Sequence, residues 1–336
     1  GGRRLHLHRL CAVQDVAGNE SVFSLTSLPR RLAVLGGGAT GCELAQAFAR
    51  LGSTVIVVEA EARLMPREEP EASHVVATAL EADGVAIGTG VALEGVERLD
   101  DRVRARLRLS ADGAVESDRV LVAVGRRPAS AGLGFEEVGV AMDERGHVRT
   151  DATLATSVKG IWAVGDVTGH MPFTHAAARM GFVAARNALA PRGRRRQRFD
   201  PRPIPWVTFT APEVGRVGMT EADAVERGGR VAYLPLDAVD RAVTTGETRG
   251  FVKLIAGPRR LLRNAGGGRL LGATVVAPTG GELIHEAALA MRTRMFTGRL
   301  AQTTHAYPTW STAIQQAAAQ FFLELEGRSA RPARRL

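Results

Sequence analysis

Three glycines and one glutamate are the residues whose types and spacing point to chemistry. Gly36, Gly38 and Gly41 form the pattern G-x-G-x-x-G, and Glu59 follows Gly41 by eighteen residues. The first glycine of such a pattern permits a tight turn, the second lets backbone amides approach a pyrophosphate, and the third lets a helix pack closely on a strand. An acid at the position of Glu59 accepts hydrogen bonds from an adenosine ribose. The spacing therefore predicts a dinucleotide site.

The elements around these glycines agree with that prediction. Residues 32–35 are apolar, as in a buried strand, and residues 44–51 repeat apolar side chains at helical spacing. A second apolar strand, residues 54–59, ends in the acid. The amides at the start of the helix would face the phosphates with a partial positive charge. Because an ionised carboxylate at Glu59 repels a 2′-phosphate, the sequence favours NAD over NADP.

Two further positions, Gly125 and Asp166, lie where apolar runs end. Residues 119–124 are apolar and β-branched, which is typical of a central parallel strand, and Gly125 follows them. Gly125 either ends the strand or lies beside the dinucleotide. A second expected strand leads into Gly165 and Asp166, ahead of a helix expected over residues 175–189. Asp166 is either a turn residue or a carboxylate that binds a sugar or ribityl hydroxyl.

Composition limits the classes of protein to consider. The chain has 336 residues, of which 45% are hydrophobic, enough for two or three domains with real cores. Its formal net charge is +9, but the arginines are scattered and aromatic residues make up only 5%, which disfavours nucleic-acid binding. No apolar run reaches the length of a membrane span. Cys11 and Cys42 form no paired motif, so we expect no disulfide scaffold, no metal site and a cytoplasmic location.

The rest of the chain divides at a proline- and arginine-rich segment, residues 191–205. Residues 1–29 carry no clear pattern and are expected to form an extended linker. Before the division, a helix is expected over residues 71–82, with strands over 85–87 and 103–109. Asp112 and Gly113 are expected to form a hairpin turn between the second of these strands and the apolar run that begins at residue 119. After it, strands are expected over residues 206–210, 230–235, 251–255 and 270–276, with a helix over 281–291, as in an α+β module.

Taken together, these segments resemble the flavin-dependent pyridine nucleotide–disulfide oxidoreductases, the family of dihydrolipoamide dehydrogenase, glutathione reductase and mercuric reductase. Four motifs carry the resemblance, in the order and at the spacings of that family. They are residues 36–43 with Glu59, residues 124–128, residues 156–166, and residues 209–220 with 305–309.

The resemblance implies roles for individual residues. Gly36, Gly38 and Gly41 would hold the NAD pyrophosphate and Glu59 its adenosine ribose. Glu43 would reach the nicotinamide end, although an acid near a helix start is also favoured by the helix dipole. Gly125 would flank the nucleotide, and Asp166 would bind the ribityl chain of FAD, with the helix that begins near His175 directed at the flavin ring. The C-terminal module would form a homodimer.

The chain also departs from the family pattern. A first Rossmann unit for FAD and a redox-active cysteine pair are not found. Tyr307 stands where the family's disulfide reductases have a histidine, Thr312 stands where they have a glutamate, and His305 comes two residues early. Tyrosine, with a solution pKa near ~10, is a poor base at neutral pH. Mercuric reductases share this tyrosine but need C-terminal cysteines, which residues 325–336 do not supply.

Two functions therefore stay open. The first is an oxidoreductase, here as a truncated chain, that passes hydride from NADH to FAD and then to an unidentified small acceptor. The second is a non-catalytic, dimeric NAD-binding remnant. Either has an α/β fold with a Rossmann-type NAD-binding domain, part of an FAD-binding domain, and an α+β dimerisation domain. The expected bounds are 1–30 for a linker, 31–148 for NAD, 149–200 for FAD, 201–326 for dimerisation and 327–336 for a basic tail.

Overall fold

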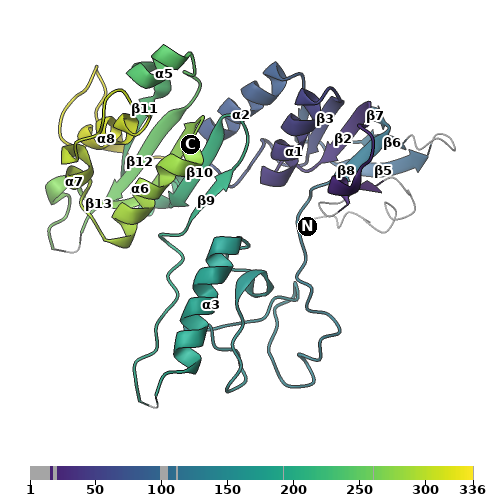
Figure 1. The fold of residues 1–336 in the computed structure, drawn as a ribbon, viewed down its shortest axis with the longest axis horizontal. Coiled ribbons are helices and arrows are strands. Elements are labelled where there is room, and N and C mark those ends of the chain that lie inside the picture. The colour runs from purple at the N-terminus through teal and green to yellow at the C-terminus, as the bar shows by residue number, and fades with distance from the viewer. Residues whose placement is uncertain are drawn as a thin grey trace. The chain divides into compact units, whose positions relative to one another are not determined.

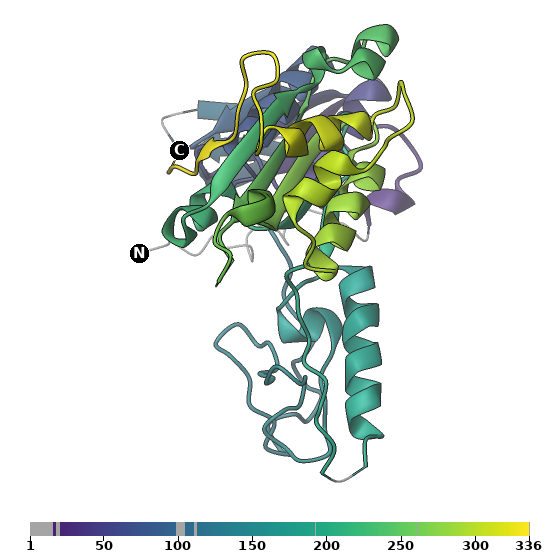
Figure 2. The same cartoon turned by 90° about the vertical axis from the view of Figure 1, so that its left-hand side faces the viewer.

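The fold of the chain was analysed in a computed structural model (Figures 1 and 2). It describes residues 16–17, 21–98, 105–110, 113–191, 193–259 and 261–335. Their backbone separates into two compact units. The first combines the chain up to Val124 with the chain from Val207 onward, and the second is Gly125–Trp206. Each unit is described by itself. The functional domain boundaries expected from the sequence remain predictions.

A five-stranded parallel sheet forms one part of the first unit. Its order is β1-β8-β2-β3-β4, with helices α1 and α2 following β2 and β3 in the chain. The bounds are β1 Val16–Ala17, β2 Arg31–Leu35, α1 Ala39–Arg50, β3 Thr54–Glu59, α2 Pro70–Ala82, β4 Ala86–Thr89 and β8 Arg119–Val122. Because β8 pairs with strands on both sides, the expected central parallel strand is confirmed. The Rossmann-like arrangement is confirmed with it.

The N-terminal segment differs from the expected linker. Val16–Ala17 pairs with β8 as a fifth parallel strand, and Val22–Ser24 forms a 3-10 turn. A strand of two residues has too little alternation to be found from its sequence. Cys11 lies outside the described residues.

A small antiparallel sheet lies between β4 and β8 in the chain. It is formed by β5 Leu93–Arg98, β6 Ala105–Leu109 and β7 Gly113–Ser117. The register pairs Leu109 with Gly113, so β6 turns back into a hairpin with β7. The expected partner was the apolar run that begins at residue 119, but that run is β8 of the parallel sheet. Asp112 itself lies outside the described residues. Strand β5 was not expected, because Gly95 interrupts its apolar pattern.

A six-stranded antiparallel sheet completes the first unit. Its order is β14-β11-β12-β13-β10-β9. Helix α6 packs against β13 and β10, and α8 against β11 and β12, so that these helices lie on one face of the sheet (Figure 2). The bounds are β9 Pro205–Thr208, β10 Glu213–Gly218, α4 Glu221–Ala224, β11 Arg230–Pro235, α5 Asp240–Thr245, β12 Phe251–Gly257, β13 Arg269–Ala277, α6 Gly280–Arg292, α7 Thr297–Gln302, α8 Thr312–Ala319 and β14 Arg331–Pro332. The expected α+β module is confirmed.

The second unit contains helix α3, Thr174–Ala188, close to the expected bounds. The prediction of a strand that leads into Gly165 is wrong. Only an isolated bridge joins Ala155 to Trp162, and the backbone then enters a 3-10 turn over Gly165–Thr168. Ile161 and Val164 are 39% and 38% exposed, so this apolar run has no neighbouring strand to bury it.

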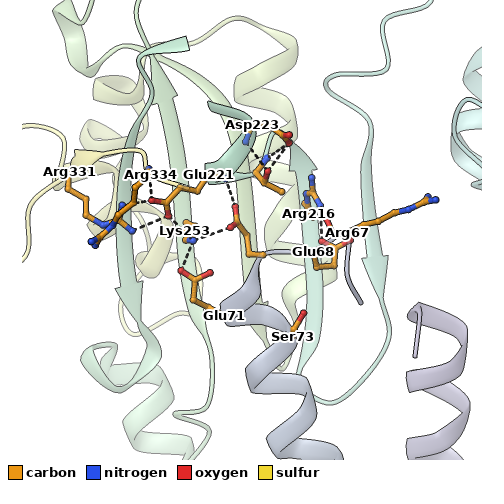
Figure 3. A network of polar contacts seen from close by, with 12 residues as sticks. Arg67, Glu68, Glu71, Ser73, Arg216, Glu221, Asp223, Lys253, Arg331 and Arg334 are labelled. Atoms are coloured by element: carbon orange, nitrogen blue, oxygen red, sulfur yellow. Dashed lines mark hydrogen bonds and ion pairs between the residues drawn. The ribbon is translucent and has the colours of Figure 1, made fainter. Parts of the chain in front are cut away.

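A buried ionic cluster joins the two sheets of the first unit (Figure 3). Lys253 on β12 is fully buried, and its Nζ donates to three carboxylates. The distances are 3.1 Å to Glu69 and 2.6 Å to Glu71, both at the start of α2, and 3.0 Å to Glu221 on α4. Arg331 on β14 forms a second ion pair with Glu221. We call these five residues the Lys253 cluster.

The carboxylates of the cluster are not equivalent. Burial raises the pKa of Glu69, and the positive charge of Lys253 offsets only part of this effect. Burial also acts to raise the pKa of Glu221, but hydrogen bonds from Arg331 and Lys253 outweigh it, and this pKa lies below its usual value. The fold therefore favours the charged form of Glu221 more than that of Glu69.

We expect Glu221→Gln to lower the free energy of unfolding at pH 7 by about 2 kcal/mol, because the buried Lys253 and the partly exposed Arg331 both lose this charged partner. The folded-state pKa of Glu221 is depressed, so its contribution is present above the unfolded-state value of 4.5 and is lost as the pH falls through the folded-state pKa. The difference between the variant and the unmodified protein should shrink below pH 4.5 in urea-unfolding curves.

Glu69→Gln is the matched control for this prediction. Its raised pKa means that the fold disfavours the charged carboxylate, so neutralisation should cost less at pH 7 than in Glu221→Gln. A larger loss in Glu69→Gln would contradict the assignment of Glu221 as the charged partner.

Candidate functional site

The glycine loop lies between β2 and α1 and brings them unusually close. Gly36 has φ +101°, and a Cβ there would lie 2.6 Å from the carbonyl oxygen of Ala123. A Cβ on Gly41 would lie 1.9 Å from the carbonyl oxygen of Gly36. Gly38 is different, because no heavy atom lies within 4 Å of the position its Cβ would take. Gly36 and Gly41 are therefore required by close packing, whereas Gly38 leaves open space at the loop.

Glu59, at the end of β3, folds back onto this loop. Its Oε2 accepts a hydrogen bond from the Gly37 amide at 2.6 Å, and its Oε1 accepts one from the Glu61 amide at 2.8 Å. The residue is 9% exposed. The structure thus brings together the glycines and the acid that the sequence singled out. Since each carboxylate oxygen has more than one lone pair, both can still accept a bond from a ribose hydroxyl.

Helix α1 directs its N-terminus toward the same loop. Its N-cap is Gly38, which has no side chain to cap the helix, and its first turn contains no acid. The first amides of a helix have no partner within it, so they carry a partial positive charge that attracts anions. The loop can therefore bind a phosphate group without any charged side chain.

Glu43 is the fifth residue of α1 and lies beyond the first turn. Its Oε1 accepts a hydrogen bond from the Phe209 amide at 2.7 Å, and burial raises its pKa. Gln46, one turn later, exchanges hydrogen bonds with the amide and carbonyl of Ala211 at 2.7 and 3.0 Å. Both side chains therefore tie α1 to the segment after β9. The role of Glu43 at the nicotinamide remains a prediction.

Cys42 is a buried residue with no exposed surface. Its Sγ donates to the carbonyl of Gly37 at 3.3 Å, and burial raises its pKa to about 12. At neutral pH it is a thiol and not the thiolate that disulfide exchange requires.

Gly125 and Asp166 both lie in the second unit. Gly125 has φ +123°, and its Cβ position is open. Asp166 lies in the turn before α3, and its carboxylate is 54% exposed and 3.8 Å from Nη1 of Arg126. Gly165 allows this turn to approach the helix, because a Cβ there would lie 3.2 Å from the Cβ of Ala177. The carboxylate is thus held near a helix N-terminus and is accessible to a ligand.

Tyr307 and His305 have separate partners. The Tyr307 hydroxyl donates to Oδ2 of Asp240 at 2.7 Å, and this hydrogen bond raises the pKa of the phenol. The side chain of His305 is 7% exposed. Its Nε2 lies 3.1 Å from both carboxylate oxygens of Glu286. Its Nδ1 lies 2.9 Å from the carbonyl oxygen of Thr303, which can only accept, so Nδ1 carries a proton.

No motif or spacing in the sequence indicates the pair formed by His305 and Glu286. Nineteen residues separate the two groups, and only the packing of the segment after α7 against α6 joins them. In the part of the chain that the structure describes, no group of three His, Cys, Asp or Glu side chains is placed to hold a metal ion. No helix in that part is both long and apolar enough to cross a bilayer.

Two family models match the chain. The model described as pyridine nucleotide-disulphide oxidoreductase matches residues 7–181. The model of the dimerisation domain of the same family matches residues 204–318. The first match covers the glycine loop and Asp166, and the second covers five strands of the antiparallel sheet, from β9 to β13, and most of its helical residues.

Curated relatives and solved structures agree with these matches. The chain is 38% identical over 296 residues to a dihydrolipoyl dehydrogenase of Thermus scotoductus, covering 87% of this chain and 62% of the relative. It is 39% identical over 310 residues to a mercuric reductase of Streptomyces lividans, covering 91% and 63%. The crystal structure of LpdA from Mycobacterium tuberculosis has a TM-score of 0.82 at 30% identity, covering 92% of this chain and 65% of that one.

A flavoprotein disulfide reductase of Escherichia coli, RclA, has a TM-score of 0.80 at 31% identity, covering 91% of this chain and 68% of that one. The chain spans about six-tenths of the length of the two curated relatives named above, 62% and 63%. The family expected from the four motifs and the expected fold are confirmed. The chain belongs to the pyridine nucleotide-disulphide oxidoreductase family.

Proposed function

We propose that this chain is the NAD-binding and dimerisation part of a flavin-dependent oxidoreductase. In this proposal NADH delivers hydride to FAD, and the electrons pass to a small acceptor whose identity is open. The observation that carries the proposal is the convergence of the open Gly38, the uncapped start of α1 and the Glu59 carboxylate at one loop. The proposed domain bounds are those expected from the sequence.

The residues at this loop fit NAD. Gly38 would leave room for the pyrophosphate, because it has no side chain, and the first amides of α1 would donate hydrogen bonds to it. Glu59 accepts hydrogen bonds from the adenosine ribose diol and disfavours the 2′-phosphate of NADP. Gly36 and Gly41 keep the helix at the distance that these contacts need.

The second unit supplies residues that fit part of FAD. FAD, when bound, accepts hydride at its flavin ring. Asp166 accepts hydrogen bonds from the ribityl chain, since its carboxylate is exposed and its ion pair with Arg126 is long. The N-terminus of α3 offers amides to the electron-rich edge of the ring. For NAD, this proposal places Gly125 beside the dinucleotide and Glu43 at the nicotinamide end.

The antiparallel sheet and its helices form the homodimer in this proposal. Support comes from the family model for residues 204–318, which is described as a dimerisation domain. Leu289 on α6 is 59% exposed, and Phe322 and Leu323 after α8 are each 49% exposed. These apolar side chains provide surface that a second copy of the chain can bury.

Gly38→Val tests the loop directly. We expect the affinity for NADH to fall by more than about tenfold, because the valine fills the space that the pyrophosphate needs. The fold should persist, since Gly38 has φ −72° and nothing within 4 Å of its Cβ position. Isothermal titration with NADH measures the change. Gly181→Val is the control, because Gly181 lies on α3 and its Cβ position is also open. An unchanged affinity for NADH in Gly38→Val would contradict the role of the loop.

Glu59→Ala tests the choice of dinucleotide. We expect NADH binding to weaken by about 1–2 kcal/mol, the scale of lost charge-assisted hydrogen bonds. The preference for NADH over NADPH should shrink, because the repulsion of the 2′-phosphate disappears. Fluorescence titration with both nucleotides gives the two affinities. If NADH and NADPH lose affinity equally, the ribose is not bound by Glu59.

The visible absorption spectrum tests the flavin part of the proposal. We expect the purified chain, after addition of FAD and gel filtration, to keep a flavin spectrum that NADH bleaches under anaerobic conditions. Asp166→Ala should reduce the amount of flavin retained, because the ribityl contact is lost. A colourless chain that still binds NADH would contradict the oxidoreductase and support the non-catalytic NAD-binding alternative.

A further inference from the structure

A basic pocket lies beside the loop that connects β12 to β13, on the antiparallel-sheet part of the first unit. It has a volume of about 510 Å³ and is lined by four arginines together with leucine and proline side chains. No aspartate or glutamate is among its described lining residues. The arginines are Arg227, Arg259, Arg269 and Arg294.

These arginines come from four different segments of the chain. Arg227 ends a 3-10 turn after α4, Arg259 lies in the connecting loop, Arg269 begins β13, and Arg294 follows α6. Their convergence therefore depends on tertiary structure and does not follow from a run of basic residues. Within the described part of the chain, neither Arg227 nor Arg294 forms an ion pair, so their charges are not neutralised by carboxylates.

Several residues of the loop that holds the pocket are fixed by local contacts. Arg259 and Arg263 exchange backbone hydrogen bonds of 2.7 and 2.9 Å. The Arg259 guanidinium stacks on the Phe296 ring, 4.1 Å from its centroid, which fixes the orientation of its planar donors. Gly267 is buried, and a Cβ there would lie 2.1 Å from Oγ1 of Thr297. The arginine at the centre of the loop is thus held in place before any ligand arrives.

Arg294 occupies a position where glycine is usual. Helix α6 ends in a Schellman motif, in which the Met295 amide donates to the Ala290 carbonyl at 2.8 Å and the Arg294 amide to the Met291 carbonyl at 3.1 Å. Arg294 has φ +57° there, a left-handed conformation that disfavours side chains. The fold therefore places a long cation at the pocket at a conformational cost.

We propose that this pocket binds a polyphosphate chain, either inorganic polyphosphate or the phosphate chain of a nucleotide. Guanidinium groups bind phosphate oxygens in bidentate geometry and stay charged at all physiological pH values. Several like charges around one pocket repel each other, and an anion with several negative charges relieves this repulsion. The volume lies within the range of about 300–1,000 Å³ that small-molecule sites occupy. The site is separate from the glycine loop and does not depend on the proposed function.

Arg227→Ala combined with Arg294→Ala tests the pocket. Both side chains are exposed and outside the core, so the variant should keep the melting temperature of the unmodified protein. Isothermal titration with tripolyphosphate at fixed ionic strength measures binding. We expect saturable binding to the unmodified protein and an affinity at least about tenfold lower in the variant, since two of the four guanidinium groups are lost.

Arg241→Ala combined with Arg249→Ala is the matched control, because it removes the same charge at exposed positions outside the pocket. We expect the control to retain its affinity for tripolyphosphate. An equal loss in both variants would show attraction to the net charge alone and would overturn the proposal. The absence of saturable binding to the unmodified protein would overturn it as well.

ATP distinguishes the two sources of the phosphate chain. The titration is done with Gly38→Val, so that the glycine loop does not contribute. Binding of both ATP and tripolyphosphate, each weakened by Arg227→Ala with Arg294→Ala, assigns the pocket to phosphate chains including those of nucleotides. Binding of tripolyphosphate alone assigns it to inorganic polyphosphate. Binding of ATP alone would overturn recognition of the phosphate chain.

Discussion

The close approach of α1 to β2 at Gly41 is the constraint on which the glycine loop and the start of α1 depend. A Cβ at this position would lie 1.9 Å from the carbonyl oxygen of Gly36. Any side chain would therefore push the helix away from the strand. The amides of the first helical turn would then leave the loop that Glu59 holds through Gly37. The geometry at this loop thus comes from the absence of side chains, and Glu59 fixes the loop from the neighbouring strand.

The parts of the fold that the sequence predicted well are those set by local pattern. From β2 to β3, the hydrophobic periodicity, the glycine turn and the terminal acid all indicate a strand, a turn, a helix and a second strand. The structure contains these elements in that order. The strand prediction for residues 161–164 is wrong, because the apolar character of a segment does not show whether a neighbouring strand exists to pair with it. Strand β10 was missed because Gly215 and Arg216 break its apolar pattern. The structure buries both residues, the glycine beneath the start of α6.

Polar pairs between distant segments could not be predicted at all. His305 follows α7 and contacts Glu286 on α6. The Lys253 cluster joins residues that are 182 and 184 positions apart. Neither sequence spacing nor motif marks such pairs, because their geometry follows from how β12 and α2 pack. Core residues also join distant segments of the chain. Val76 and Leu80 of α2 belong to one hydrophobic cluster with Phe251 and Val276 of the antiparallel sheet.

The Lys253 cluster also sets an order for biosynthesis. Glu69 leaves the ribosome 184 residues before the lysine that neutralises it. At about 5–20 residues per second, this interval lasts roughly 10–40 s. During that time the start of α2 can stay hydrated, because its partner strand β12 does not yet exist. The contacts between α2 and β12 can therefore form only after most of the chain has been made, and the segment Gly125–Trp206 is synthesised between the two parts of the first unit.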